Sequence, residues 1–146
     1  PTVVLTDSDD EQLLGALRGR PVIDYVLKNG AHQIEHVAYL IGRLRENRAK
    51  KILVVDDSRS YRAYLVALLE RYFYTTLQAG DGLEALDVLE AHPDITLVLT
   101  DINMPRLDGF GLIARIRQRY RREDLAVIGV SDSSTPGMSA RILKAG

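Results

Sequence analysis

Residues 52–57, Ile-Leu-Val-Val-Asp-Asp, decide the fold that we predict for this chain. They form a short run of β-branched and aliphatic residues that ends in two carboxylates. Such a run is typical of a strand that is buried on both faces of a parallel sheet. Polar groups that follow strands of this kind meet at the carboxyl edge of the sheet, where α/β proteins build their sites. Asp56 and Asp57 are therefore the first candidate site residues.

Three further apolar runs precede polar residues in the same way. They are residues 22–26 before Lys28, 95–99 before Asp101, and 127–130 before Ser131. Amphipathic stretches separate the runs, and they are residues 31–47, 60–72, 82–91 and 109–120. This alternation predicts repeated βα units, and therefore an α/β fold with a parallel sheet and helices on both of its faces. In the helix expected at 60–72, the apolar residues predicted to face inward are Tyr64, Leu65, Leu68 and Leu69.

The composition limits the class of protein. The chain has 146 residues, 46% of them hydrophobic, and a formal net charge of -1, so nothing favours nucleic acid or an anionic membrane as a partner. It has no cysteine, which excludes disulfides and thiolate zinc sites. Its apolar runs are too short to cross a bilayer, and its first residues lack a signal-peptide pattern. We therefore expect a soluble, cytoplasmic protein.

The polar groups at the strand ends form a chemically coherent set. Two carboxylates about 4 Å apart repel each other by roughly 4 kcal/mol at an effective dielectric constant near 20. Three carboxylates, from Asp56, Asp57 and Asp101, therefore need a cation to stay ionised together. Oxygen ligands suit Mg²⁺, while the Ser131 hydroxyl and the Lys28 ammonium suit phosphoryl oxygens. The sequence predicts a site for Mg²⁺ and a phosphoryl group.

A weak internal repeat suggests how the chain is divided. Residues 2–9 match residues 126–134 in character, with Thr6 opposite Ser131. We therefore expect residues 1–48 to close one domain and residues 50–146 to open a second domain of the same kind. Such a chain would be a piece of a longer polypeptide.

Several pieces of the sequence resemble the receiver domains of bacterial two-component response regulators. They are residues 52–58, 81–86 and 101–110, the run that ends at Ser131, and Lys144-Ala-Gly, all at the spacings usual in that family. The resemblance implies a flavodoxin-like, doubly wound parallel sheet of five strands in the order 2-1-3-4-5. Residues 1–48 would be the C-terminal part of a first receiver, from strand 4 to helix 5. Residues 50–146 would be the N-terminal part of a second, from strand 1 to helix 4.

The resemblance also implies a role for each candidate residue. Asp101 would accept a phosphoryl group from a histidine kinase or phosphotransfer protein, and Ser131 and Lys28 would bind the phosphoryl oxygens. The implied Mg²⁺ ligands are Asp56, Asp57, Asp101 and the backbone carbonyl of Asn103. The implied switch residues are Ser131, Thr6 and Tyr25. The domain would be a signalling module and not an enzyme, and it would control an output domain in the same polypeptide, such as a diguanylate cyclase.

Other readings stay open at this point. A degenerate receiver that only docks or dimerises would have the same fold. A magnesium-dependent phosphatase would need a second acid two residues after its nucleophile, where this chain has Asn103. Residues 21–146 could form one permuted receiver, with Lys28 reaching Asp101. Alternatively, two copies could exchange segments in a homodimer, or the parent could hold two ordinary receivers in tandem.

Overall fold

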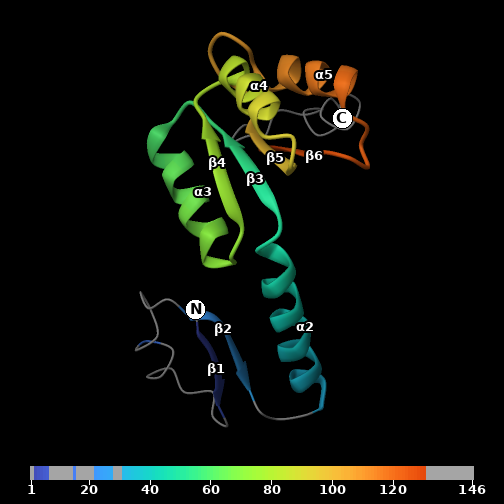
Figure 1. Ribbon diagram of the computed structural model, residues 1–146. Coiled ribbons are helices and arrows are strands. Elements are labelled where there is room, and N and C mark those ends of the chain that lie inside the picture. Colours follow the sequence, from blue (N-terminus) through green and yellow to red (C-terminus); the bar gives the residue numbers. More distant parts are fainter. Residues whose placement is uncertain (1, 7–14, 16–21, 28–30, 131–146) are drawn as a thin grey trace, which may run out of the picture.

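The structure, a computed structural model, describes residues 2–6, 15, 22–27 and 31–130 (Figure 1). Strands and helices alternate along most of these ranges, as the sequence predicts. The elements are β1 (Thr2–Thr6), β2 (Val22–Leu27), α2 (Ala31–Asn47), β3 (Lys51–Val55), α3 (Arg59–Arg71), β4 (Thr75–Ala79), α4 (Gly82–Ala91), β5 (Ile95–Asp101), α5 (Gly109–Arg119) and β6 (Ala126–Val130). Among the described helices, none has both the length and the apolarity needed to cross a bilayer.

Four strands form the sheet that carries the site. Their order is β4-β3-β5-β6, and each neighbouring pair is parallel. Counted from β3 as the first strand of its domain, this is the 2-1-3-4 part of the expected order 2-1-3-4-5. The predicted α/β fold with a parallel, receiver-like sheet is therefore confirmed. The last helix that the resemblance implies, helix 4 of the second receiver, would follow Ser131 and lies outside the described residues.

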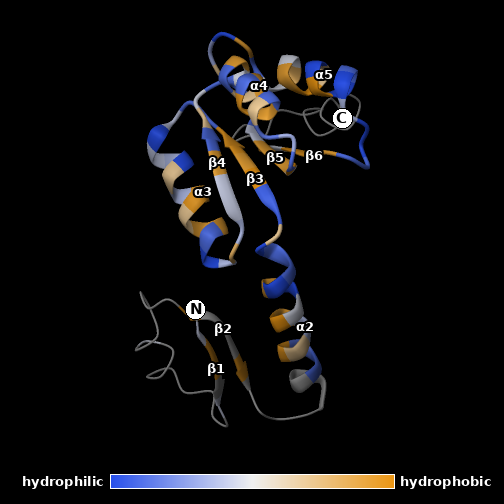
Figure 2. Cartoon of the chain, viewed as in Figure 1, coloured by the Kyte–Doolittle hydropathy of each residue, from blue (hydrophilic) through white to orange (hydrophobic). Residues whose placement is uncertain are grey.

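The main core lies between this sheet and helices α4 and α5. It contains Leu53 and Val55 from β3, Val98 from β5, and Leu112 and Ile116 from α5, all at most 1% exposed. Figure 2 shows that β3 is apolar along most of its length, which its burial on both faces requires. Helix α3 packs against β3 and β4, and so the sheet is covered from more than one side.

One expectation about α3 is wrong. Tyr64 and Leu68 are 60% and 40% exposed, whereas Leu65 and Leu69 are half-buried. None of the residues of α3, all of which the structure describes, is fully buried. The apolar face of α3 is wider than the part of the helix that contacts the sheet. Periodicity alone shows which residues share a helix face, but not where the contact with the sheet ends.

The first two strands form a separate sheet. β1 and β2 are parallel and pair from Thr2 with Val22 to Thr6 with Leu27. The permuted arrangement, in which β2 would join the sheet of β6, is therefore not the one in this structure. The assignment of residues 1–48 to a first receiver stays a prediction.

Candidate acidic site at the carboxyl edge of the sheet

β3 delivers two carboxylates to the carboxyl edge of the four-stranded sheet. The Asp56 amide donates to the carbonyl oxygen of Ala79 at 3.2 Å, which extends the pairing with β4 past the end of β3. The Asp56 side chain is buried, and its Oδ1 accepts a hydrogen bond from the Ser58 amide at 2.9 Å. Asp57 is exposed. One carboxylate therefore lies in the protein and its neighbour faces solvent.

β5 delivers the third carboxylate to the same edge. Val55 pairs with Thr100, so Asp56 and Asp101 follow at equivalent positions of adjacent strands. Asp101 is half-buried, and its Oδ1 accepts a hydrogen bond from the Ile102 amide at 2.6 Å. This register places the predicted acceptor beside the acidic pair.

A pocket of about 490 Å³ contains all three carboxylates. Its lining residues are Asp56, Asp57, Ser58, Tyr61, Asp101, Asn103 and Val130. The predicted convergence of Asp56, Asp57, Asp101 and Asn103 at one edge is thus present in the structure.

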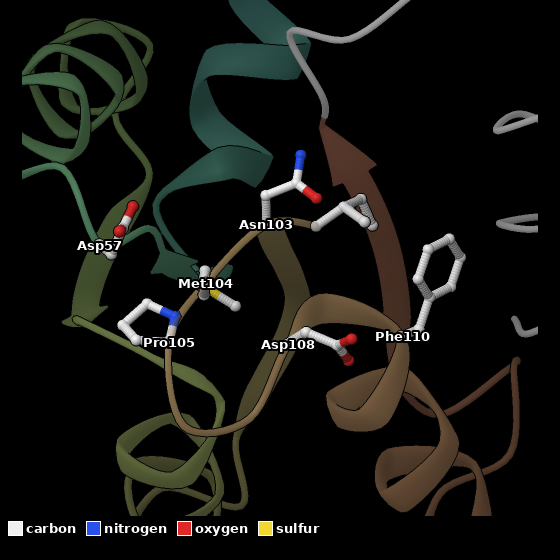
Figure 3. Close-up of a pocket in the computed structure, with 7 residues that line it drawn as sticks. Asp57, Asn103, Met104, Pro105, Asp108 and Phe110 are labelled. Carbon is white, nitrogen blue, oxygen red and sulfur yellow. The ribbon is translucent and has the colours of Figure 1, made fainter. Parts of the chain in front are cut away.

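A larger pocket of about 620 Å³ lies along the loop that follows β5 (Figure 3). Its lining residues are Asp57, Ile102, Asn103, Met104, Pro105, Asp108 and Phe110. It shares only Asp57 and Asn103 with the acidic pocket. Because it lacks Asp56 and Asp101, we place the chemistry in the smaller pocket.

The electrostatics of Asp56 reflect this crowding. Burial raises the pKa of its carboxyl above the usual 3.8, and the negative charges of Asp101 and Asp57 raise it further. The hydrogen bond from Ser58 and the charge of Arg62 act in the opposite direction. The Arg62 guanidinium also donates to the backbone oxygen of Asp56. Ionisation of Asp56 is therefore harder than that of a carboxyl group in water, and a nearby cation would make it easier.

The donor set fits a magnesium ion in its chemistry. Among the described residues, no three acidic or imidazole groups are close enough to enclose a metal. The acidic pocket nevertheless offers hard oxygen donors. They are the carboxylates of Asp56, Asp57 and Asp101 and the oxygen atoms of Asn103. Besides burial, the negative charges of Asp101 and Asp57 raise the pKa of Asp56, and a divalent cation would offset those charges.

The loop after Asp101 is fixed to the start of α4. Arg106, which has a left-handed φ of 64°, forms an ion pair with the buried carboxylate of Asp81. The Gly82 amide donates to the Leu107 carbonyl at 3.1 Å, and a Cβ atom on Gly82 would lie 2.6 Å from that oxygen. The sequence motif Asp81-Gly82 predicts a helix cap, which is present, but not the ion pair with Arg106.

The remaining predicted residues are not brought to this site by strand pairing. Thr6 and the backbone of Tyr25 belong to the two-stranded sheet. Ser131 follows β6 directly, but it and Lys28 lie outside the described residues. Their roles stay predictions.

Comparisons with known proteins identify the family. The sequence model of one protein family, the response regulator receiver domain, matches residues 52–146. A chemotaxis protein CheY homolog from Campylobacter jejuni is 35% identical over 97 residues, which cover 66% of this chain and 75% of that protein. The two-component response regulator ORR7 of Oryza sativa is 30% identical over 95 residues, which cover 65% of this chain and 45% of that protein.

Solved structures agree. A two-component system response regulator/GGDEF domain protein is 41% identical and superposes on 100% of this chain with a TM-score of 0.91, while the chain spans 60% of that protein. A response regulator receiver protein from Pseudomonas putida is 29% identical, with a TM-score of 0.60 over 66% of this chain and 79% of its own. This chain thus spans less than two thirds of the rice regulator and of the GGDEF regulator. By its family match and its parallel sheet, the chain belongs to the response regulator receiver domains of two-component systems.

Proposed function

We propose that the acidic pocket is a phosphoacceptor site and that Asp101 accepts the phosphoryl group. The donor would be a phosphohistidine on a histidine kinase or a phosphotransfer protein. The observation that carries this proposal is the convergence of Asp56, Asp57 and Asp101 in one pocket at the carboxyl edge of the sheet. Three carboxylates at one site fit a role in which one reacts and the others hold a cation.

Asp101 is suited to the role of nucleophile. The Ile102 amide holds its Oδ1 at 2.6 Å, which leaves Oδ2 to attack phosphorus. The new O–P bond forms an acyl phosphate as the N–P bond of the donor breaks, and the electron pair of that bond stays on the imidazole nitrogen. Asp101 is half-buried and lines the pocket, where a donor side chain would approach it.

Mg²⁺ would be held by Asp56, Asp57, Asp101 and the backbone carbonyl of Asn103. When bound, it offsets negative charge and coordinates phosphoryl oxygens. Asp56 and Asp57 supply the charge for that binding, and the Ser58 amide and Arg62 orient Asp56. The Ser131 hydroxyl and the Lys28 ammonium, from this chain or a second copy, would bind the other phosphoryl oxygens.

Phosphorylation would then change the conformation and control an output domain. Ser131, Thr6 and Tyr25 are the proposed switch residues. One of the structural relatives named above combines a response regulator with a GGDEF domain, so we propose a diguanylate cyclase as the output, in the same cytoplasmic polypeptide. The receiver itself would be a signalling module without turnover.

Phosphate incorporation tests this proposal. The protein is incubated with Mg²⁺ and a phosphorylated histidine kinase, and an acyl phosphate is detected by its sensitivity to hydroxylamine. Asp101→Asn should abolish incorporation, because an amide oxygen is a poor nucleophile. Asp108→Asn is the matched control, since Asp108 lines only the larger pocket and an amide can still cap α5 through the Gly111 amide.

Two results would count against the proposal. Incorporation that persists in Asp101→Asn would remove Asp101 as the acceptor. No incorporation into the parent, from any histidine kinase or small phosphodonor, would favour the docking module without phosphorylation.

A further inference from the structure

The connection between α2 and β3 is short, and its backbone is hydrogen-bonded. Only residues 48–50 separate the last residue of α2, Asn47, from the first residue of β3. The Lys50 amide donates to the Asn47 carbonyl at 3.0 Å, and the Lys50 carbonyl accepts from the Thr75 amide at 3.2 Å. The Ala49 amide donates to the Glu46 carbonyl at 3.1 Å. The backbone is therefore held at each step from the helix into the sheet.

Asn47 joins the end of α2 to the end of α3. It is only 4% exposed, and its Nδ2 donates to the backbone carbonyl of Tyr72 at 3.0 Å. Tyr72 is the C-cap of α3, where carbonyl groups lack helical partners. The Oδ1 atom of Asn47 is buried and has no hydrogen-bond partner among the described residues. Burial of an amide group that makes only part of its hydrogen bonds is unfavourable. The bond to Tyr72 offsets part of that cost, and it forms only while α2 stays at the end of α3.

Phe73 adds a second unusual contact. Its φ of 66° lies in the left-handed region, where a bulky non-glycine residue is rare. The ring lies against the connector that follows α2, where the Arg48 guanidinium lies 4.6 Å from the ring centroid. A pocket of about 250 Å³ lies at the same place, and its lining residues are Ile41, Leu44, Arg45, Arg48 and Phe73. A strained backbone conformation of this kind persists only where the surrounding contacts hold it in place.

The comparison with solved structures supports a fixed junction. The GGDEF regulator superposes on the whole chain with a TM-score of 0.91, whereas a receiver protein covers 66% of it at 0.60. A score of 0.91 over the full length requires the upstream elements and the four-stranded domain to be disposed alike in both proteins. The junction therefore has the same geometry in a relative with 41% identity.

We propose that the turn between α3 and β4, residues 72–74, is a docking site for the C-terminal end of α2. Docking makes α2 and the four-stranded domain one rigid body. A conformational change on either side is then conveyed across the junction as a movement of α2, because no flexible linker absorbs it. This inference does not depend on phosphorylation at Asp101.

The distance between α2 and the four-stranded domain provides the test. The chain has no cysteine, so Ala38→Cys on α2 and Glu90→Cys on α4 accept spin labels at these two exposed positions only. In the full-length protein without Mg²⁺ or phosphodonor, we expect a single narrow distance distribution. A broad distribution in this parent would overturn the proposal.

Variants of Asn47 test the hydrogen bond. Asn47→Asp keeps the shape of the side chain but places acceptors against the Tyr72 carbonyl, so the distribution should broaden and shift. Asn47→Ala should broaden it less, since it removes the donor without adding repulsion. Glu46→Ala, at the exposed neighbouring position, is the matched control and should leave the distribution unchanged. An unchanged distribution in Asn47→Asp would contradict the docking role.

Variants of Phe73 separate the ring from the backbone. Phe73→Gly and Phe73→Ala both remove the ring and should broaden the distribution equally. Glycine tolerates the left-handed conformation and alanine does not, so the glycine variant should unfold about 4 °C or more above the alanine variant. Equal melting temperatures would show that the strain is absent, and a distribution as narrow as the parent's in both variants would show that the ring has no docking role.

Discussion

The pKa of an aspartate is shifted in opposite directions at the two edges of the four-stranded sheet. At the carboxyl edge, burial and the charges of Asp101 and Asp57 raise the pKa of Asp56. At the amino edge, a hydrogen bond from Lys51, whose Nζ lies 2.6 Å from the carboxylate, lowers the pKa of Asp94. The amino edge pairs its polar groups, whereas the carboxyl edge gathers groups that repel. The like charges gathered in this pocket support our proposal that the carboxyl edge holds the functional site.

The largest expected effect comes from backbone packing at the carboxyl edge. A Cβ atom on Gly109 would collide with the backbone oxygen of Asp101 and would lie 2.7 Å from Cα of Ile102. Gly109→Ala should therefore destabilise the fold by about 3 kcal/mol. Urea unfolding measures the change. Gly42→Ala on α2 is the control, because its Cβ meets no atom within 4 Å and alanine favours a helix. Equal stabilities of the two variants would show that the backbone at Gly109 has room for a Cβ atom beside Asp101.

The next effect concerns the ion pair beside the site. Arg106→Asn keeps a residue that tolerates the left-handed backbone but leaves the buried Asp81 carboxylate unpaired, which should cost about 1 to 2 kcal/mol. Asp81→Asn retains an oxygen that can cap α4. In the double variant the loss should be smaller than the sum of the two single losses, as measured by urea unfolding. Strict additivity would mean that the pair contributes nothing.

Removal of the Asp56 charge should stabilise the metal-free protein. Asp56→Asn keeps an oxygen for the Ser58 amide and removes the repulsion, so a gain of about 1 kcal/mol is expected at neutral pH. A raised folded pKa favours the protonated form, so ionisation destabilises the fold as pH rises through that pKa. The gain should therefore disappear below pH 3.8, where the parent is protonated too. A variant less stable than the parent at neutral pH, without Mg²⁺, would show that Asp56 is not under electrostatic stress.

The smallest effect is expected at the amino edge, with the opposite sign. Asp94→Asn should lower stability slightly at neutral pH, because it removes the partner of Lys51 in an exposed pair. The lowered folded pKa means that this contribution is present above pH 3.8 and is lost as pH falls through the folded pKa. Thermal unfolding at several pH values compares Asp94→Asn with Asp56→Asn. The same pH trend in both variants would remove the contrast between the edges.

The sequence predicts those features that depend on neighbouring residues and on a general rule of the fold. An apolar run that ends in Asp56 and Asp57, and another that ends in Asp101, place the carboxylates at one edge because parallel strands share a direction. The family follows from the same motifs. The exposed Tyr64 and Leu68 were beyond such reasoning, because the width of a helix contact depends on what lies opposite.

Contacts between distant residues were also beyond the sequence. The bond between Asn47 and Tyr72 spans 25 positions, and the pair of Arg106 with Asp81 depends on how one loop crosses the start of α4. The left-handed Phe73 has no local signal, since glycine is the usual residue in that conformation. The pairing of β2 with β1 is likewise a choice between partners that single-strand patterns do not distinguish.

The short connector between α2 and β3 bears on the construction of hybrid regulators. The connector, Arg48-Ala49-Lys50, is short and basic, and in the sequence it resembles a boundary between domains. A graft made there would separate Asn47 from Tyr72 and Arg48 from Phe73, and the transplanted receiver would lose its orienting helix. Chimeras should therefore carry Ala31–Asn47 together with the domain that follows, and the joint belongs ahead of that helix.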